Sequence, residues 1–222
     1  MVSSIMRIPS DSKLLFIGDS ITDAGRSDCG ETTPWDPQLG LGHGYVNLVN
    51  AFLSAEHAAQ NIRVLNKGVS GHTVLDLKAR WDEDVLAHQP DWLSVKIGIN
   101  DVWRHFDTPQ RTESHVGPEL FEQTLRGLLE KTRPQLKGLI LMSPYLIETS
   151  LNDPMRQQMD AYGAIVKAMA ADFDAIFVDT QAAIDRVLKD VHPTALAWDR
   201  IHPGTTGHMI LARAFLGAIG NL

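Results

Sequence analysis

The sequence predicts an α/β fold, a three-layer α/β/α sandwich around a five-stranded parallel sheet. Short apolar runs alternate along the chain with longer segments of helical hydrophobic spacing. Strands joined through helices form right-handed crossovers, which keep the strands parallel and cover both faces of the sheet. The 222 residues contain no internal repeat, low-complexity tract or interdomain linker, so we expect a single domain over residues 1–222.

The five predicted strands are continuous apolar runs, which are typical of parallel strands that are buried on both faces. In chain order they cover residues 14–17, 62–65, 92–97, 139–142 and 175–178.

The predicted helices fill the segments between these runs and follow the last one. They cover residues 45–54, 74–86, 118–132, 154–171, 181–191 and 205–216. The helix from Pro118 shows its apolar face well, because Phe121, Leu125 and Leu129 recur at helical spacing.

Three connections are unusually long, at residues 24–44, 103–117 and 143–153. Each follows a strand, so all three rise from the carboxyl edge of the sheet, where ligands bind in this architecture. They carry Trp35, Trp103, Phe106 and Tyr145. These aromatic side chains either wall a cleft or anchor the loops to the body or to a second subunit, and the sequence leaves both readings open.

Composition excludes several classes of function. The net charge of −7 comes without a run of like charges, so the electrostatic footprint of nucleic-acid binding is missing. The single cysteine, Cys29, excludes an intrachain disulfide and a cysteine-cluster metal site. No signal peptide or membrane-length apolar run is visible, so we expect a soluble, cytoplasmic protein with no membrane partner.

The stretch "LLFIGDSITDAG" begins as a buried strand and stops abruptly at Asp19 and Ser20. Read alone, it is a strand, a tight turn and a capped helix. It also places the Ser20 hydroxyl at the carboxyl edge of the sheet, near helix N-terminal N–H groups that favour negative charge.

Two more segments follow predicted strands. "NKGVSGHT" offers the backbone N–H of Gly71, and "GINDVW" offers the side-chain NH₂ of Asn100; both are donor types found in oxyanion holes. The alternatives are an ordinary glycine-rich turn and turn capping by asparagine. We expect Asp101 to be structural, bonding loop N–H groups.

In "WDRIHPGTTGH", Asp199 and His202 are three residues apart, so in a helix-like turn the carboxylate reaches the imidazole. That bond fixes the tautomer and leaves the other ring nitrogen free to take a proton from a serine. The alternatives are a loop salt bridge or a metal pair, but no further metal-ligand set is found and we predict no metal. We expect His208 to pack within the last helix.

Taken together, these segments supply a nucleophile (Ser20), a base (His202), an orienting carboxylate (Asp199) and three oxyanion donors from Ser20, Gly71 and Asn100. This set predicts acyl transfer through a covalent acyl-serine.

From residue 14 to about residue 216, the chain resembles the SGNH hydrolases, or GDSL esterases. Four blocks occur in family order: "GDS" with Ser20, "NKGVSG" with Gly71, "GIND" with Asn100, and "DRIH" with Asp199 and His202. Ile21 stands where the family name has leucine, a volume-conserving exchange. The resemblance implies a flavodoxin-like sandwich that needs no cofactor.

Other segments, including "NKGVSGHTVLDLKARW" and "ALAWDRIHPGTTGHMILARAF", resemble the intracellular acetylxylan esterases of xylan-degrading bacteria. The resemblance implies removal of acetyl groups from small acetylated carbohydrates and a homo-oligomer. Neighbouring branches, namely arylesterases and thioesterase/lysophospholipases, share the same blocks, and a non-catalytic carbohydrate-binding protein is a further alternative. Because flat indole rings suit sugar faces, we expect Trp35, Trp103 and Trp198 to bind substrate.

Overall fold

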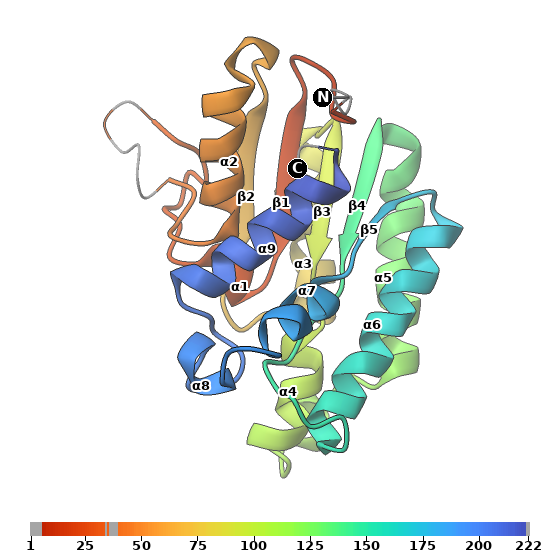
Figure 1. Cartoon of the computed structure of the whole chain (residues 1–222). Coiled ribbons are helices and arrows are strands. Elements are labelled where there is room, and N and C mark those ends of the chain that lie inside the picture. The colour runs from red at the N-terminus through yellow and green to blue at the C-terminus, as the bar shows by residue number, and fades with distance from the viewer. Residues whose placement is uncertain (1–5, 34, 36–39, 221–222) are drawn as a thin grey trace.

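The computed structural model describes residues 6–33, 35 and 40–220 (Figure 1). Its sheet has five parallel strands in the order β2-β1-β3-β4-β5. The strands are β1 (Lys13–Gly18), β2 (Arg63–Gly68), β3 (Trp92–Lys96), β4 (Gly138–Met142) and β5 (Ile176–Val178). The five predicted strands and their parallel pairing are confirmed, and the order is that of flavodoxin-like sheets.

The helices within the described ranges are α1 (Ser20–Asp23), α2 (Tyr45–Glu56), α3 (Val74–Asp84), α4 (Ile99–Asp107), α5 (Pro118–Thr132), α6 (Pro154–Asp172), α7 (Thr180–Val187), α8 (Pro193–Leu196) and α9 (Thr205–Ala218). Short 3₁₀ turns are η1 (Ala58–Gln60), η2 (Leu86–His88), η3 (Thr112–Ser114) and η4 (Arg133–Gln135). In Figure 1, α2 and α9 lie in front of the sheet, and α9 also contacts α7. Helices α3, α5 and α6 pack against one another in that order on the other face of the sheet, with α5 and α6 to the right of it in Figure 1, which completes the three layers.

The core lies on both faces of the sheet because the central strands are buried and mainly apolar, although β3 also buries Ser94 and Lys96. In β1, Phe16 is fully buried, and its ring meets Tyr45 of α2 and Phe215 of α9 at centroid distances of 5.8 and 5.0 Å. Behind the sheet, the Nε1–H of Trp81 in α3 donates to Thr132 Oγ1 in α5 over 2.7 Å. Each large apolar side chain buried in this way stabilises the fold by about 2–3 kcal/mol.

The connection predicted at residues 103–117 is not a loop at its start, because helix α4 runs through it to Asp107. Ile99, Val102, Trp103 and Phe106 stand at helical spacing, and the first two are buried. The asparagine and aspartate after the strand indicated a turn, but they occupy the first turn of this helix.

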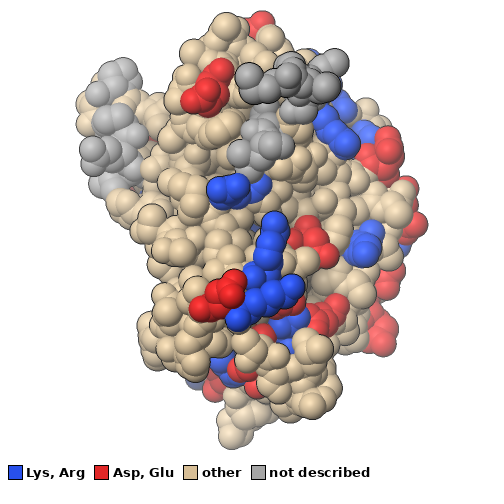
Figure 2. Space-filling model, in the orientation of Figure 1, with Lys and Arg blue, Asp and Glu red and all other residues tan. Residues whose placement is uncertain are grey.

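Within the described ranges, no helix combines the length and apolar character that a bilayer crossing requires. Figure 2 shows acidic and basic side chains interspersed on the face that carries α2 and α9. On this face the net negative charge is therefore not gathered into one patch.

Candidate active site

The predicted site residues lie at the carboxyl edge of the sheet. Ser20 follows β1, Gly71 follows β2 and Asn100 follows β3. In this strand order the chain passes from β1 outward to β2 and then crosses to β3 on the other side of β1. A parallel sheet opens a crevice at such a switch point, because the connections on its two sides diverge.

Ser20 is the first residue of α1, directly after the strand end. Asp19 caps this short helix, since its Oδ1 accepts a hydrogen bond from the Ile21 N–H over 3.0 Å. The cap turns the chain sharply where β1 ends. The Ser20 hydroxyl Oγ thereby lies 2.8 Å from His202 Nε2.

The predicted bond between Asp199 and His202 is present, with Asp199 Oδ2 2.6 Å from His202 Nδ1. Asp199 Oδ1 also accepts from the backbone N–H groups of Ile201 and His202, over 3.0 and 2.9 Å. Burial alone raises the pKa of Asp199, but these hydrogen bonds outweigh it and hold that pKa below its ordinary value. An ionised Asp199 accepts the Nδ1–H, so in a neutral imidazole Nε2 is the acceptor facing Ser20.

Gly71 lies on an exposed turn with a φ of +82°, a left-handed conformation that favours glycine. A Cβ built at this position meets no atom within 4 Å, so the backbone borders open space. The turn is tied to the serine segment, because Asp23 Oδ2 accepts from the N–H and Oγ of Ser70 over 3.1 and 2.6 Å.

Asn100 lies in the first turn of α4 and is 1% exposed. Its Nδ2 donates to the carbonyl of His72 over 3.0 Å, which joins the segments that follow β2 and β3. The neighbouring Asp101 is structural, as predicted, because its Oδ1 accepts from the Val74 N–H over 3.0 Å. Burial raises the pKa of Asp101 to about 7.

The three predicted substrate-binding tryptophans lie in different settings. The Trp103 ring stands edge-on to the His202 ring at a centroid distance of 5.7 Å. Trp198 directly precedes Asp199 in the chain and is 86% exposed, and Trp35 is 84% exposed. In the part of the chain that the structure describes, neither of these two tryptophans makes a ring contact or hydrogen bond with the side chain of Ser20, Asp199 or His202.

Tyr145 anchors its loop to the body of the protein. Of the two alternatives for the aromatic residues of the long connections, the structure therefore shows anchoring for Tyr145. Its side chain is fully buried, and its hydroxyl donates to the carbonyl of Ile201 over 3.0 Å. The connection from β4 thereby holds the segment that carries His202.

Two residues that brace the site were not predicted from the sequence. Asn66 in β2 is fully buried, and its Nδ2 donates to the carbonyls of Thr22 and Leu41 over 2.7 and 2.9 Å. Arg80 of α3 donates to the Gly18 carbonyl at 2.9 Å and to His72 Nδ1 at 2.9 Å. Asn66 could have been recognised from the sequence, because an asparagine inside an apolar strand is unusual. No local sequence feature distinguishes Arg80.

His208 packs within α9, as predicted, and its Nδ1 accepts from the Tyr45 N–H over 3.2 Å. Burial, the main cause, together with the positive charge of Lys96, lowers the pKa of His208 to about 4. His208 is therefore neutral over the range in which an exposed histidine titrates.

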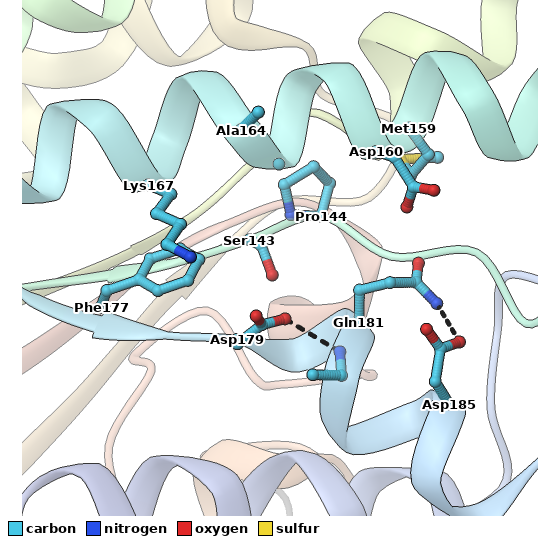
Figure 3. Close-up of a pocket in the computed structure, with 12 residues that line it drawn as sticks. Ser143, Pro144, Met159, Asp160, Ala164, Lys167, Phe177, Asp179, Gln181 and Asp185 are labelled. Atoms are coloured by element: carbon cyan, nitrogen blue, oxygen red, sulfur yellow. Dashed lines mark hydrogen bonds between the residues drawn. The ribbon is translucent and has the colours of Figure 1, made fainter.

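A pocket of about 230 Å³ opens between α6 and α7, away from the predicted residues, none of which lines it (Figure 3). Its carboxylates have structural partners: Asp179 caps α7 through the Ala182 N–H, Asp185 accepts from Gln181 Nε2, and Asp160 accepts from Arg156 Nε. Gln181 also accepts from the Leu146 N–H over 2.7 Å. This network fastens the connection that holds the His202 segment.

Across residues 6–33, 35 and 40–220, no three histidine, cysteine, aspartate or glutamate side chains gather as a metal site would require.

Comparison with known proteins places this site in a family context. Residues 16–210 match the model of the GDSL-like Lipase/Acylhydrolase family. The chain is 55% identical over 216 residues to an acetylxylan esterase of Geobacillus stearothermophilus, covering 97% of each chain. The crystal structure of Axe2, an acetylxylan esterase from that organism, superposes with a TM-score of 0.94 at 56% identity over 97% of each chain.

Solved variants of Axe2 described as catalytic mutants replace a serine, an aspartate and a histidine with alanine, and the aspartate and histidine are three positions apart. A more distant relative is the thioesterase 1/protease 1/lysophospholipase L1 of Escherichia coli K12, 26% identical over 96% of this chain and 85% of its own.

Proposed function

We propose, from the premise that this chain belongs to the GDSL-like lipase/acylhydrolase family, that it is a serine esterase that removes acetyl groups from acetylated xylo-oligosaccharides. The observation that carries the proposal is the hydrogen-bonded series Asp199–His202–Ser20, with lengths of 2.6 and 2.8 Å, at the switch point of the sheet. Asp199 and His202 keep the spacing of the catalytic aspartate and histidine of Axe2.

In the acylation step, neutral His202 takes the proton of Ser20 through Nε2 as the hydroxyl attacks the ester carbonyl. Asp199 stabilises the imidazolium that forms and keeps Nδ1 protonated. The negative charge that develops on the carbonyl oxygen is received by the N–H groups of Ser20 and Gly71 and by the Asn100 amide. His202 then gives its proton to the departing sugar hydroxyl, which leaves an acetyl-serine.

In the deacylation step, a water molecule takes the place of the sugar. His202 removes a proton from this water, which attacks the acetyl carbonyl, and the same donors receive the second oxyanion. Collapse of that intermediate returns the proton to Ser20 and releases acetate. No cofactor is required by this sequence of steps.

Acetylated carbohydrate is favoured as the substrate class because the acetylxylan esterase relative matches over 97% of both chains. The tryptophans fit this class, since an indole ring stacks well on the apolar face of a sugar. We propose that Trp103, beside His202, contacts the acetylated residue and that Trp198 and Trp35 contact sugars farther from the ester.

The deciding experiment compares acetate release from acetylated xylo-oligosaccharides with cleavage of a medium-chain p-nitrophenyl ester, with Ser20→Ala as the control. We expect fast acetate release that disappears in the variant. Fast medium-chain cleavage with little acetate release would keep the triad but overturn the substrate class. A folded protein that binds xylo-oligosaccharides without either activity would overturn the enzymatic proposal.

A thioesterase or lysophospholipase activity is the second candidate, because the Escherichia coli relative carries that name. Its identity of 26%, against 55% for the acetylxylan esterase, makes it the weaker one. Rates that rise with acyl chain length would favour it.

We further propose that residues 1–222 form one domain and that the enzyme works in the cytoplasm as a homo-oligomer. One continuous hydrophobic core supports the single domain. Leu151 and Met209, which are 64% and 44% exposed, offer apolar surface for contact between subunits. The compartment is carried over from the resemblance to intracellular acetylxylan esterases. Sedimentation tests the oligomeric state, and cell fractionation tests the compartment.

A further inference from the structure

Arg104 contacts the group that is proposed to receive the oxyanion. Its Nη2 donates to Asn100 Oδ1 over 3.1 Å, one turn farther along α4. On the other side of the same amide, Asn100 Nδ2 donates to the carbonyl of His72 over 3.0 Å. The second N–H of this NH₂ group has no protein partner among the described residues, so it is available to a ligand.

These two contacts select one of the two orientations of the amide. If the amide were rotated by 180°, Oδ1 would face the His72 carbonyl and the NH₂ group would face the guanidinium. Both pairs would then repel, acceptor against acceptor and donor against donor. The His72 carbonyl alone would hold only the NH₂ group of the Asn100 amide. Arg104 also holds its oxygen and thereby fixes the orientation of the whole amide.

The guanidinium of Arg104 is itself held in place. It forms an ion pair with Asp107 and lies over the Trp103 ring at 5.0 Å from the centroid. Trp103 in turn stands edge-on to His202. Because arginine stays ionised at every working pH, its bond to the amide oxygen is charge-assisted and polarises the amide toward stronger N–H donation.

We propose that Arg104 is a positioning residue that fixes and polarises the Asn100 side chain as an oxyanion donor, an inference that rests on the proposed function. Arg104 acts through Asn100 and does not touch the reacting atoms. Its removal is therefore expected to lower kcat without weakening binding of the ground-state substrate.

The test is a double-mutant cycle with Arg104→Met and Asn100→Ala, measured on p-nitrophenyl acetate and on acetylated xylo-oligosaccharides. A whole oxyanion donor contributes roughly 10²–10³ in kcat, so we expect Arg104→Met to lower kcat about tenfold, with KM changed by less than about twofold. In the Asn100→Ala background the same substitution should change kcat by less than about twofold, because the residue it acts through is gone.

Arg126→Met is the matched control. Arg126 also lies on a helix, pairs with carboxylates (Glu122 and Asp172) and stands over an aromatic ring at 5.7 Å, but it binds no group of the site. Its substitution should leave kcat unchanged. Arg104→Lys, which keeps the charge and one donor, should recover part of the lost activity, and it replaces the methionine variant if that variant does not fold.

The outcomes separate the two proposals. Full activity in Asn100→Ala would overturn the oxyanion assignment itself. A loss in Asn100→Ala without a loss in Arg104→Met or Arg104→Lys would overturn only the role of Arg104. A loss in Arg104→Met that persists undiminished in the Asn100→Ala background would also overturn it, because the arginine would then act by another route.

Discussion

Ser20, Gly71 and Asn100 each follow a strand of the central sheet, whereas Asp199 and His202 lie in a segment that reaches this edge from outside, between α8 and α9. The Asn100 residue is 1% exposed, while the His202 side chain is 42% exposed. The half of the site that is proposed to receive charge is therefore built at the strand ends of the sheet, and the half that is proposed to move protons is attached to it.

The two halves are also braced differently. Asn66 and Arg80 tie the strand ends to one another through buried or half-buried hydrogen bonds, and Asp23 adds an exposed hydrogen bond to Ser70. The His202 segment instead depends on Asp199 within it and on contacts with the connection after β4. One of these contacts is the bond from the Ile147 N–H to the Arg200 carbonyl at 2.9 Å. If the proposed oxyanion site is fixed in the sheet and the proposed base is held separately, substitutions in the two halves should impair the enzyme in different ways.

The largest effect is expected from Ser20→Ala, because it removes the group on which both halves act. Loss of a triad member costs roughly 10⁴–10⁶ in kcat. Acetate release should fall to that extent while the unfolding transition stays within a few degrees of wild type. Retention of more than a few per cent of activity would contradict Ser20 as the nucleophile.

Asn100→Ala should have the next largest effect, since it removes one donor and leaves the triad intact. We expect kcat to fall by about 10²–10³, equivalent to roughly 3–4 kcal/mol of barrier. The measurement is steady-state kinetics on p-nitrophenyl acetate with circular dichroism as the folding control. A fall in kcat/KM that arises only from KM would contradict a role in the transition state.

Arg200→Met tests the attachment of the proton-transfer half. Arg200 Nη1 donates to Glu148 Oε2 and Asp153 Oδ2, both at 2.9 Å, and its side chain is 38% exposed. Since solvent partly screens these ion pairs, we expect the free energy of unfolding to fall by only about 1 kcal/mol. We expect kcat to fall about three- to tenfold, because His202 would be positioned less accurately. Lys131→Met, which breaks the Lys131–Asp82 ion pair outside the site, should leave kcat unchanged. Equal kcat in the two variants would contradict the attachment.

The smallest effect on turnover is expected from substitution of His208, because this residue affects the pH dependence of the free energy of unfolding rather than the reaction. Its pKa is about 4 in the folded protein against an ordinary 6.5, so below pH 6.5 the unfolded chain binds a proton that the folded protein does not. Stability should fall as the pH drops from 6.5 to 4, by roughly 3 kcal/mol at 1.36 kcal/mol per pKa unit.

His208→Asn keeps an acceptor for the Tyr45 N–H but does not titrate. Denaturant unfolding at a series of pH values measures the difference between the two proteins. We expect wild type to lose stability relative to the variant between pH 6.5 and 4, and parallel curves would contradict the neutral His208.

The positions of the proposed reacting residues could be predicted from the sequence better than the contacts that hold them in place. Ser20, Gly71, Asn100, Asp199 and His202 stand in short blocks whose chemistry can be read locally, and the structure brings them to one edge of the sheet. The strands were predictable for a related reason, because burial on both faces leaves a continuous apolar run.

The supporting contacts depend on tertiary structure. Arg80 reaches Gly18, 62 positions away in the chain, and no local pattern marks it among the polar residues of an amphipathic helix. Arg104 is different, because it lies four residues after Asn100 and a predicted helix would have placed the two on one face. Because residues 103–117 were predicted as a loop, the contact between Arg104 and Asn100 was not foreseen.

The most direct test of the central claim is to label the protein with an organophosphonate ester and to map the adduct by mass spectrometry. Trypsin should release residues 14–26, "LLFIGDSITDAGR", in which Ser20 is the only serine. We predict one adduct on this peptide, formed in step with the loss of acetate release and absent in Ser20→Ala. An adduct on the peptide that carries Ser70, or labelled Ser20 with full activity, would contradict it.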